Sequence, residues 1–220
     1  MKVCTDACVL GAWTAMKAEQ LSMNTILDIG TGTGLLCLML AQKTTASIDA
    51  IEISKDAAEQ AKENVEASPW QNRINIHCCS LQEYKTNKRY DLIICNPPFY
   101  ENDLRSTDAN KNAAKHDTSL RLEELLRGVS NNLSDEGFAT VLIPFHRTAY
   151  FEEAASRQSF FIWEKLLLKQ TPAHDPFRTI VLLSPKKTAM PVSCELVIHD
   201  TQRSYTNDFN RLLKAYYLKL

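Results

Sequence analysis

Hydrophobic and polar residues alternate along the chain with two different periods, and the changes of period predict a succession of strands and helices. Short, largely apolar runs predict buried strands at 25–29, 47–53, 73–79 and 90–95. Apolar residues at helical spacing predict helices at 7–20, 35–43 and 55–67. Because strands and helices alternate, we expect an α/β fold with a mostly parallel sheet and helices on both of its faces.

The second half of the chain begins with a long polar stretch and then returns to the same alternation. Periodicity fails between residues 100 and 118, where Asn, Asp and Lys are frequent. A loop of this length in a compact domain is usually functional or disordered, so we expect a mobile loop that contacts the substrate. Further helices are predicted at 120–133, 148–159 and about 207–218, strands at 138–144, 161–169, 179–184 and 193–199, and a turn at Asp135-Glu136-Gly137.

Length and composition are typical of a single globular domain. The chain has 220 residues, 45% of them hydrophobic and 23% charged, which suits one α/β core spanning residues 1–220. No apolar run approaches the roughly 18 residues of a membrane span, and the first residues lack the pattern of a secretory signal. We therefore expect a cytoplasmic protein with no membrane association and no obligate protein partner.

Cysteine spacing argues against a metal-binding protein, and net charge argues against a protein that coats nucleic acid. The seven cysteines include no Cys-x-x-Cys pair and no other spacing typical of metal ligands, so we expect buried thiols and no metal site. The formal net charge is −1, whereas a protein that coats nucleic acid is basic. Any contact with RNA would therefore come from a local patch of the surface.

A glycine-rich turn, LDIGTGTG, spans residues 27–34 between a predicted strand and a predicted helix. The glycines let the chain turn tightly and bring its backbone against a ligand. Their G-x-G-x-G spacing differs from the G-x-G-x-x-G of dinucleotide folds. Asp28, at the end of the strand, also argues against a phosphate, because on Coulomb grounds a carboxylate there suits a cationic amine or sulfonium.

The end of the next predicted strand supplies a second polar position. Glu52 follows Gly32 by 20 residues, and a carboxylate there can accept hydrogen bonds from both hydroxyls of a ribose. Ile53 beside it can pack on the face of an adenine. Together the two segments predict a site for a nucleoside with a cationic group.

These segments resemble the first two motifs of the class I S-adenosylmethionine-dependent methyltransferases. The resemblance implies a Rossmann-like sheet with an antiparallel strand near the C-terminal end, and S-adenosyl-L-methionine as the cofactor. It assigns the methionine and sulfonium end to Asp28, Gly30 and Gly32 and the ribose to Glu52, with Thr31 and Leu81 as further contacts. Ser80 stands where the family normally has an acid that contacts the adenine, and a neutral hydroxyl holds an amine less firmly than a carboxylate does.

The strand predicted at 90–95 runs directly into Asn96-Pro97-Pro98-Phe99. Two consecutive prolines fix their φ angles and remove two backbone donors, so local carbonyls stay unpaired. With the side-chain carbonyl of Asn96 they predict a rigid pair of acceptors for a planar amine, and Phe99 can stack on the attached ring. Acceptors that bind the developing positive charge stabilise attack of the nitrogen on a methyl sulfonium. We therefore predict that these four residues are catalytic.

The four residues match the (N/D/S)-P-P-(Y/F/W) motif of amino-methyltransferases that act on adenine N6, cytosine N4 or glutamine N5. Other segments are similar, in order, to the family of bacterial tRNA1(Val) adenine-37 N6-methyltransferases. The segments are MKVCTDACVLGAW, LDIGTGTGLL, IEISKDAAEQAKENVEASPW, YDLIICNPPFY and the terminal YTNDFNRLLKAYYLKL. The resemblance covers nearly the whole chain and implies methylation of N6 of an adenosine in tRNA.

Further contacts are implied by this second resemblance. Lys2, Thr5 and Asp6 match the segment that closes over the methionine end of the cofactor, and Asn96 also counts among the cofactor contacts. An anticodon-loop adenosine must be splayed out and stacked before it reacts. Candidate RNA contacts are Tyr100, Arg105, Lys111, Lys115 and His116 in the polar loop, and Arg178, Lys186, Lys187, Arg203 and Arg211 farther along the chain.

Three alternatives stay open at the level of the sequence. The Asn-Pro-Pro start is shared with enzymes that methylate glutamine N5 in proteins, although those usually carry an added N-terminal helical domain. Ribosomal RNA could supply the adenosine in place of tRNA. The third alternative is a non-catalytic nucleoside- or RNA-binding module on the same fold, which only Ser80 favours.

Overall fold

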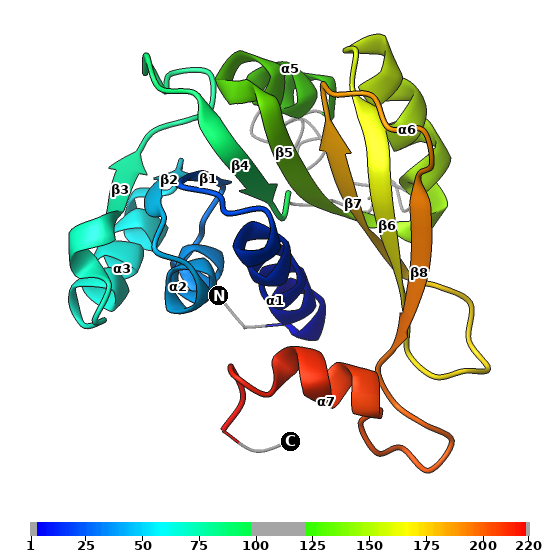
Figure 1. Ribbon diagram of the computed structural model, residues 1–220. Helices are drawn as coiled ribbons and strands as arrows, with labels where there is room; N and C mark the ends of the chain where they lie inside the picture. Colours follow the sequence, from blue (N-terminus) through cyan, green and yellow to red (C-terminus); the bar gives the residue numbers. More distant parts are fainter. Residues whose placement is uncertain (1–3, 98–121, 219–220) are drawn as a thin grey trace, which may run out of the picture.

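A single mixed sheet with helices on both faces forms the centre of the computed structural model, which describes residues 4–97 and 122–218 (Figure 1). The strands are β1 (Thr25–Ile29), β2 (Ser47–Glu52), β3 (Ile74–Cys78), β4 (Tyr90–Cys95), β5 (Leu133–Pro144), β6 (Phe161–Lys169), β7 (Arg178–Ser184) and β8 (Val192–Val197). The helices are α1 (Thr5–Gln20), α2 (Leu35–Lys43), α3 (Lys55–Glu66), α5 (Leu122–Asn132), α6 (Thr148–Arg157) and α7 (Asn207–Leu213), with short 3-10 helices η1 (Gln71–Arg73) and η2 (Phe145–Arg147). None of the described helices is long and apolar enough to cross a membrane.

The strand order is β3-β2-β1-β4-β5-β7-β6-β8. Strands β1 to β5 run parallel, and β7 is antiparallel to its neighbours β5 and β6. The predicted α/β fold is therefore confirmed, including the antiparallel strand near the C-terminal end. The chain winds outward from β1 to β3 and then returns to β4 on the other side of β1. At such a switch point the carboxyl ends of parallel strands leave a crevice for ligands.

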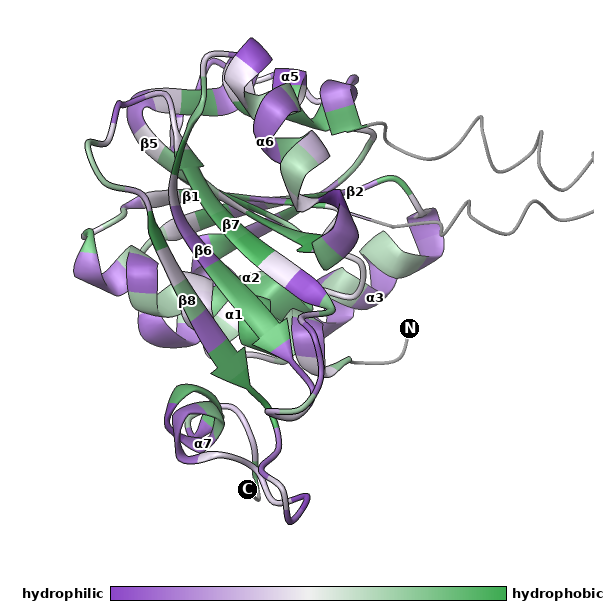
Figure 2. Ribbon diagram, turned by 90° about the vertical axis from the view of Figure 1, so that its right-hand side faces the viewer, coloured by the Kyte–Doolittle hydropathy of each residue, from purple (hydrophilic) through white to green (hydrophobic). Residues whose placement is uncertain are grey.

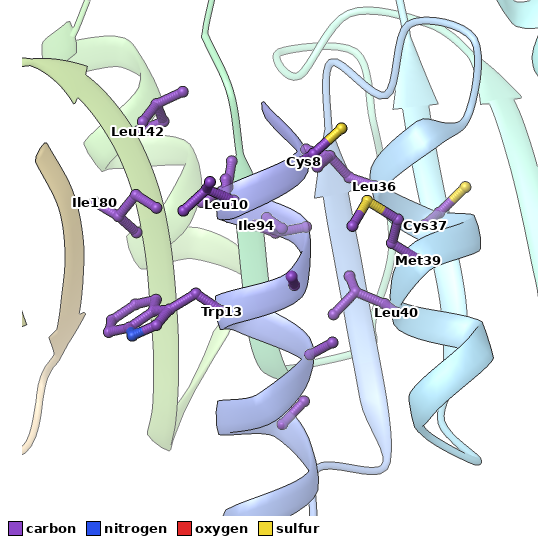
Figure 3. Packing of buried hydrophobic residues seen from close by; sticks show 14 of the residues in the cluster. Cys8, Leu10, Trp13, Leu36, Cys37, Met39, Leu40, Ile94, Leu142 and Ile180 are labelled. Atoms are coloured by element: carbon purple, nitrogen blue, oxygen red, sulfur yellow. The ribbon is translucent and has the colours of Figure 1, made fainter. Parts of the chain in front are cut away.

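Each face of the sheet buries a separate hydrophobic cluster. Helices α1 and α2 cover one face, where Leu10 of α1 and Leu40 of α2 belong to the same buried cluster as Ile94 of β4 (Figure 3). Helices α5 and α6 cover the other face, where Val129 and Phe151 pack with the opposite side chains of the strands. Because both faces are buried, hydrophobic residues dominate the inner strands (Figure 2).

Most predicted elements are confirmed, with ends shifted by one or two residues. The turn predicted at Asp135-Glu136-Gly137 is wrong, because these residues lie inside β5. Leu133 of β5 lies opposite Tyr90 of β4, and the next pair is Phe138 opposite Leu92. Between these two pairs β5 has more residues than β4, and the additional residues of β5 form an irregularity of the strand. The loop predicted at 100–118 and the first two residues of the helix predicted at 120–133 lie outside the described residues.

The C-terminal helix is shorter than predicted and ends at Leu213. The Leu213 carbonyl accepts hydrogen bonds from the backbone N–H groups of Tyr216 at 2.8 Å and Tyr217 at 3.2 Å, which tightens the chain into a turn. Tyr217 then lies edge-on to Phe209, with ring centroids 6.2 Å apart. Aromatic packing against α7 therefore replaces the last turns of the predicted helix.

The cysteines are all free thiols, but the prediction that they are buried is only partly right. Cys8, Cys37 and Cys95 are buried, and burial raises the pKa of the Cys37 thiol to about 12. Cys4, Cys78 and Cys194 are exposed. Cys78 ends β3 and Cys194 lies on β8, and these are the two end strands of the sheet in the described part of the chain.

A buried polar cluster stands within β2. Asp49 is 3% exposed, and its carboxylate accepts hydrogen bonds from Lys88 Nζ at 2.7 Å, Tyr90 OH at 2.7 Å and Asn75 Nδ2 at 3.0 Å. Burial raises the pKa of this carboxyl, but the three donors outweigh burial and hold the pKa below its ordinary value. A carboxylate is tolerated at this depth because its oxygens are paired.

We predict that Asp49→Asn lowers the free energy of unfolding by about 1–3 kcal/mol at pH 7, because charge-assisted hydrogen bonds are lost. A carboxylate with a depressed pKa stabilises the fold above its unfolded pKa of about 4, and this stabilisation disappears as the pH falls through the folded pKa. Urea denaturation of both proteins at neutral and acid pH measures the difference, which should shrink in acid. Exposed Asp135→Asn is the control. A difference independent of pH would contradict the role given to the charge.

Candidate functional site

The carboxyl ends of β1, β2 and β4 meet at one edge of the sheet and bring together residues that the sequence singled out. The register pairs Ile29 of β1 with Ile51 of β2 and with Cys95 of β4. Gly30, Glu52 and Asn96 therefore follow one another at the same level on three adjacent strands, although they are far apart in sequence. In open α/β sheets, ligands bind at such an edge, where the strand order reverses.

The glycine-rich turn adopts the left-handed backbone conformations that favour glycine. The φ angles are 72° at Gly30, 59° at Gly32 and 88° at Gly34. The backbone N–H groups of Gly30 and Thr31 donate to the Ile51 carbonyl at 2.9 and 3.0 Å, which holds the turn against β2. A Cβ at Gly30 would meet no described atom within 4 Å. The turn therefore borders a space into which ligand atoms can approach the backbone.

Asp28, near the end of β1, is fully buried. Its Oδ2 accepts a hydrogen bond from Thr31 Oγ1 at 2.7 Å, whereas its buried Oδ1 has no hydrogen-bond partner among the described residues. Burial raises the pKa of this carboxyl to about 7, and the charge of Glu52 adds to the rise. An unpaired buried oxygen is costly, so this position suits a ligand that brings a donor or a positive charge.

Glu52 is held as an acceptor by the surrounding backbone. Its Oε2 accepts from Gly32 N and its Oε1 from Ser54 N, both at 2.8 Å. Each carboxylate oxygen has two lone pairs, so each can accept one further hydrogen bond from a pair of neighbouring hydroxyls. Ile53 next to it is 65% exposed and presents an apolar surface to a planar ring.

The loop after β3 reaches the same edge. The Cys79 N–H donates to the Glu52 carbonyl at 3.0 Å, so Ser80 follows close to Glu52. Ser80 Oγ donates to Glu83 Oε2 at 2.7 Å, and Glu83 N donates back to Ser80 Oγ at 3.2 Å. Glu83 was missed in the sequence, although Ser-x-x-Glu spacing is the signal of such a reciprocal pair. Ser80, which stands where the family normally has an acid, therefore holds the carboxylate of Glu83 next to it. Leu81 is half-buried and packs towards Gly128 of α5.

Thr5 and Asp6 lie at the start of α1. Asp6 Oδ1 accepts from Ala7 N at 2.9 Å, and Asp6 Oδ2 accepts from Arg178 Nε at 3.1 Å. Arg178 is the first residue of β7, opposite the carboxyl end of β5, so the ion pair joins α1 to that end of the sheet. Asp6 and Arg178, predicted to contact cofactor and RNA respectively, are thus bound to each other. Two more of the predicted RNA contacts are paired with acids, Lys186 with Glu136 and Arg211 with Asp208.

The catalytic motif is described only in part. Asn96 is half-buried and Pro97 is buried directly after β4. The other predicted site residues lie outside the described residues, namely Lys2, Pro98, Phe99, Tyr100, Arg105, Lys111, Lys115 and His116. Within the described ranges no group of three or more His, Cys, Asp and Glu side chains is arranged to hold a metal ion.

Sequence reasoning also missed the segment that follows β5 at this edge. The register pairs Cys95 of β4 with Val141 of β5, and β5 runs on past this level to Pro144 before it continues into η2 at the same edge of the sheet. Phe145, His146 and Arg147 of η2 are exposed. The sequence did contain a signal for this segment, namely an aromatic and two basic residues directly after a strand that ends at the edge of the candidate site.

Relatives with an assigned activity match this chain over its full length. A tRNA1(Val) (adenine(37)-N6)-methyltransferase from Dyadobacter fermentans is 43% identical over 223 residues, which are 100% of this chain and 91% of the relative. Proteins of the same name from Cytophaga hutchinsonii and Bacteroides fragilis are each 40% identical over 100% of this chain and 92% of their own length. A family model described as the methyltransferase small domain matches residues 13–119.

Solved structures share the fold. A protein from Agrobacterium tumefaciens, described as a predicted O-methyltransferase, superposes with a TM-score of 0.74 at 18% identity, covering 96% of both chains. The glycopeptide N-methyltransferase MtfA, solved with sinefungin, superposes with a TM-score of 0.60 at 11% identity over 80% of this chain and 87% of its own. At these identities the likeness concerns the fold alone. The full-length relatives decide the family: the chain belongs to the tRNA1(Val) (adenine(37)-N6)-methyltransferases, which depend on S-adenosylmethionine.

Proposed function

We propose that this protein transfers the methyl group of S-adenosylmethionine to N6 of adenosine 37 in the anticodon loop of tRNA1(Val). The observation that carries the proposal is the convergence of Asp28, Glu52 and Asn96 at the carboxyl ends of adjacent strands. The names of the relatives point to the RNA substrate, and the chemistry of the three side chains supports the cofactor and the amine.

The residues of this edge fit S-adenosylmethionine. The unpaired Oδ1 of Asp28 and the open space beside Gly30 suit the cationic methionine end. Glu52 can accept from the two ribose hydroxyls, and Ile53 can pack on the adenine. Bound there, the cofactor supplies an electrophilic methyl group on a sulfonium. Thr31 supports Asp28 through its hydroxyl.

Asn96 and Pro97 act on the substrate amine in this proposal. The Asn96 side-chain carbonyl and a neighbouring backbone carbonyl accept the two N6 hydrogens, and Phe99 stacks on the ring. The exocyclic nitrogen is a weak nucleophile because its lone pair is delocalised into the base. The two acceptors stabilise the positive charge that develops on this nitrogen, and they hold it in line with the methyl group. The proton then leaves the methylated nitrogen, and no base is needed before attack.

Methyl transfer to tRNA is the first test. Purified protein is incubated with labelled S-adenosylmethionine and total tRNA from a strain that lacks this activity, and the nucleosides are analysed. We expect label in N6-methyladenosine, and far less of it with the Asn96→Ala protein. Cofactor binding without label in tRNA would overturn the assignment, and parallel reactions with ribosomal RNA and with a glutamine-containing protein substrate identify the acceptor.

We predict that Asn96→Ala reduces turnover by roughly a hundredfold or more while the affinity for the cofactor stays largely unchanged. The reason is that Asn96 acts mainly on the amine, where charge develops only in the transition state. Single-turnover rates measure the first quantity and titration calorimetry the second. Asn96→Asp, which keeps an acceptor oxygen, should retain more activity. Equal losses of affinity and turnover would contradict this division of roles.

We predict that the affinity for S-adenosylmethionine rises with pH through about 7, because the Asp28 carboxyl, whose pKa is raised to about 7, must ionise to pair with a cation. Asp28→Asn should weaken binding by about tenfold to a hundredfold and remove this pH dependence. Titration calorimetry between pH 6 and pH 8 measures both effects, with Asp135→Asn as the control.

The raised pKa of Asp28 also gives the unliganded protein a characteristic stability profile. The folded pKa lies above the unfolded value of about 4, so the unfolded state loses its proton first. Stability should therefore fall as the pH rises from about 4 to about 7 and then level off. Thermal unfolding of the unliganded Asp28→Asn protein should show a flatter profile and a higher midpoint at pH 8. A profile that follows the wild type would show that Asp28 does not titrate in this range.

A further inference from the structure

Two aromatic rings and two basic side chains are exposed within six residues of η2 and the first turn of α6. Phe145 is 36% exposed and Tyr150 is 44% exposed, and His146 and Arg147 between them are also exposed. We call these four residues the aromatic–basic strip. Exposed aromatic rings next to basic side chains are the residue types that bind single-stranded nucleic acid.

The aromatic–basic strip lies at the same edge of the sheet as the candidate active site. The parallel register of β4 and β5 places Val141 opposite Cys95, so the chain leaves β5 for η2 at the same edge at which Asn96 follows β4. The segment is anchored from both sides. Phe145 N donates to the Phe177 carbonyl at 3.1 Å, and Thr148 Oγ1 donates to the Phe145 carbonyl at 2.8 Å.

The four residues of the strip include an arginine and a histidine and no acid, although the chain has a net charge of −1. Within the part of the chain that the structure describes, neither His146 nor Arg147 has an ion-pair partner. Of the acids that flank the strip in the helices, Glu152 and Glu153 are paired with cations outside it, whereas Glu123 contacts the strip itself. Glu123 accepts from the Tyr150 hydroxyl, Glu152 pairs with Lys165 at 2.6 Å, and Glu153 pairs with Arg157 at 2.7 Å.

We propose that the aromatic–basic strip binds the RNA backbone and the unstacked bases next to the reacting adenosine. Single-stranded RNA is bound by aromatic faces on which bases stack and by cations that meet the phosphates. Phe145 and Tyr150 supply the faces, and Arg147 supplies the cation. This inference rests on the proposed function and adds a substrate contact that lies outside the Asn-Pro-Pro-Phe motif and the loop after it.

The test is binding of an unmodified anticodon stem-loop RNA, measured by fluorescence anisotropy with S-adenosylhomocysteine present. Phe145→Leu keeps an apolar side chain but removes the ring face, and we expect RNA affinity to fall on the order of tenfold. Arg147→Gln should weaken binding several-fold and lower the slope of log affinity against log salt by about 1. Arg147→Lys, which keeps the charge, should recover most of the affinity.

Arg157→Gln is the matched control, because Arg157 is an exposed arginine at the other end of α6 and pairs with Glu153. It should bind RNA as the wild type does. Cofactor affinity by calorimetry and the thermal midpoint should be unchanged in every variant, which separates RNA binding from folding. Two results would contradict the proposed role of the strip and leave the proposed methylation of tRNA unaffected. One is wild-type RNA affinity in Phe145→Leu and Arg147→Gln, and the other is an equal loss of affinity in Arg157→Gln. A wild type that neither binds nor methylates RNA overturns both proposals.

Discussion

The parallel pairing of β1 with β2 on one side and β4 on the other is the constraint on which the site depends. Parallel strands end at the same edge of a sheet, so Gly30, Glu52 and Asn96 arrive together although 66 residues separate the first from the last. Such pairing requires crossover connections: α2 connects β1 to β2, and the chain returns to β4 only after α3 and β3. The crossovers that bring these strand ends together therefore also supply helices that cover one face of the sheet.

Two buried carboxylates on neighbouring strands differ in their hydrogen-bond partners and in the direction of their pKa shifts. Asp49 is surrounded by donors from other strands and loops, and its pKa is lowered. Asp28 lies one strand away with a single side-chain donor and an unpaired oxygen, and its pKa is raised to about 7. A satisfied carboxylate adds to the stability of the sheet, whereas an unsatisfied one lowers stability until a ligand provides the missing partner.

The distribution of charge reconciles a slightly acidic protein with a nucleic-acid substrate. Several cations that the sequence offered are bound to acids within the fold, including Arg178, Lys186 and Arg211. Arg147 is exposed and lies at the edge that carries the site. Because screened surface charges act over about 10 Å, the cations near the reacting atoms matter more for the substrate than the net charge of the chain does.

Much of this protein follows from the sequence by itself. Period and propensity are local properties, so the strands, most helices and the glycine turn were predictable, and the motifs singled out Asp28, Glu52 and Asn96 as candidate site residues. Tertiary structure alone decided which residues meet. The Asp6–Arg178 ion pair and the extension of β5 through the predicted turn depend on strand order and register. The exposure of Phe145 likewise depends on where β5 ends. Contacts between residues distant in sequence are set by how layers pack, and no local pattern encodes that packing.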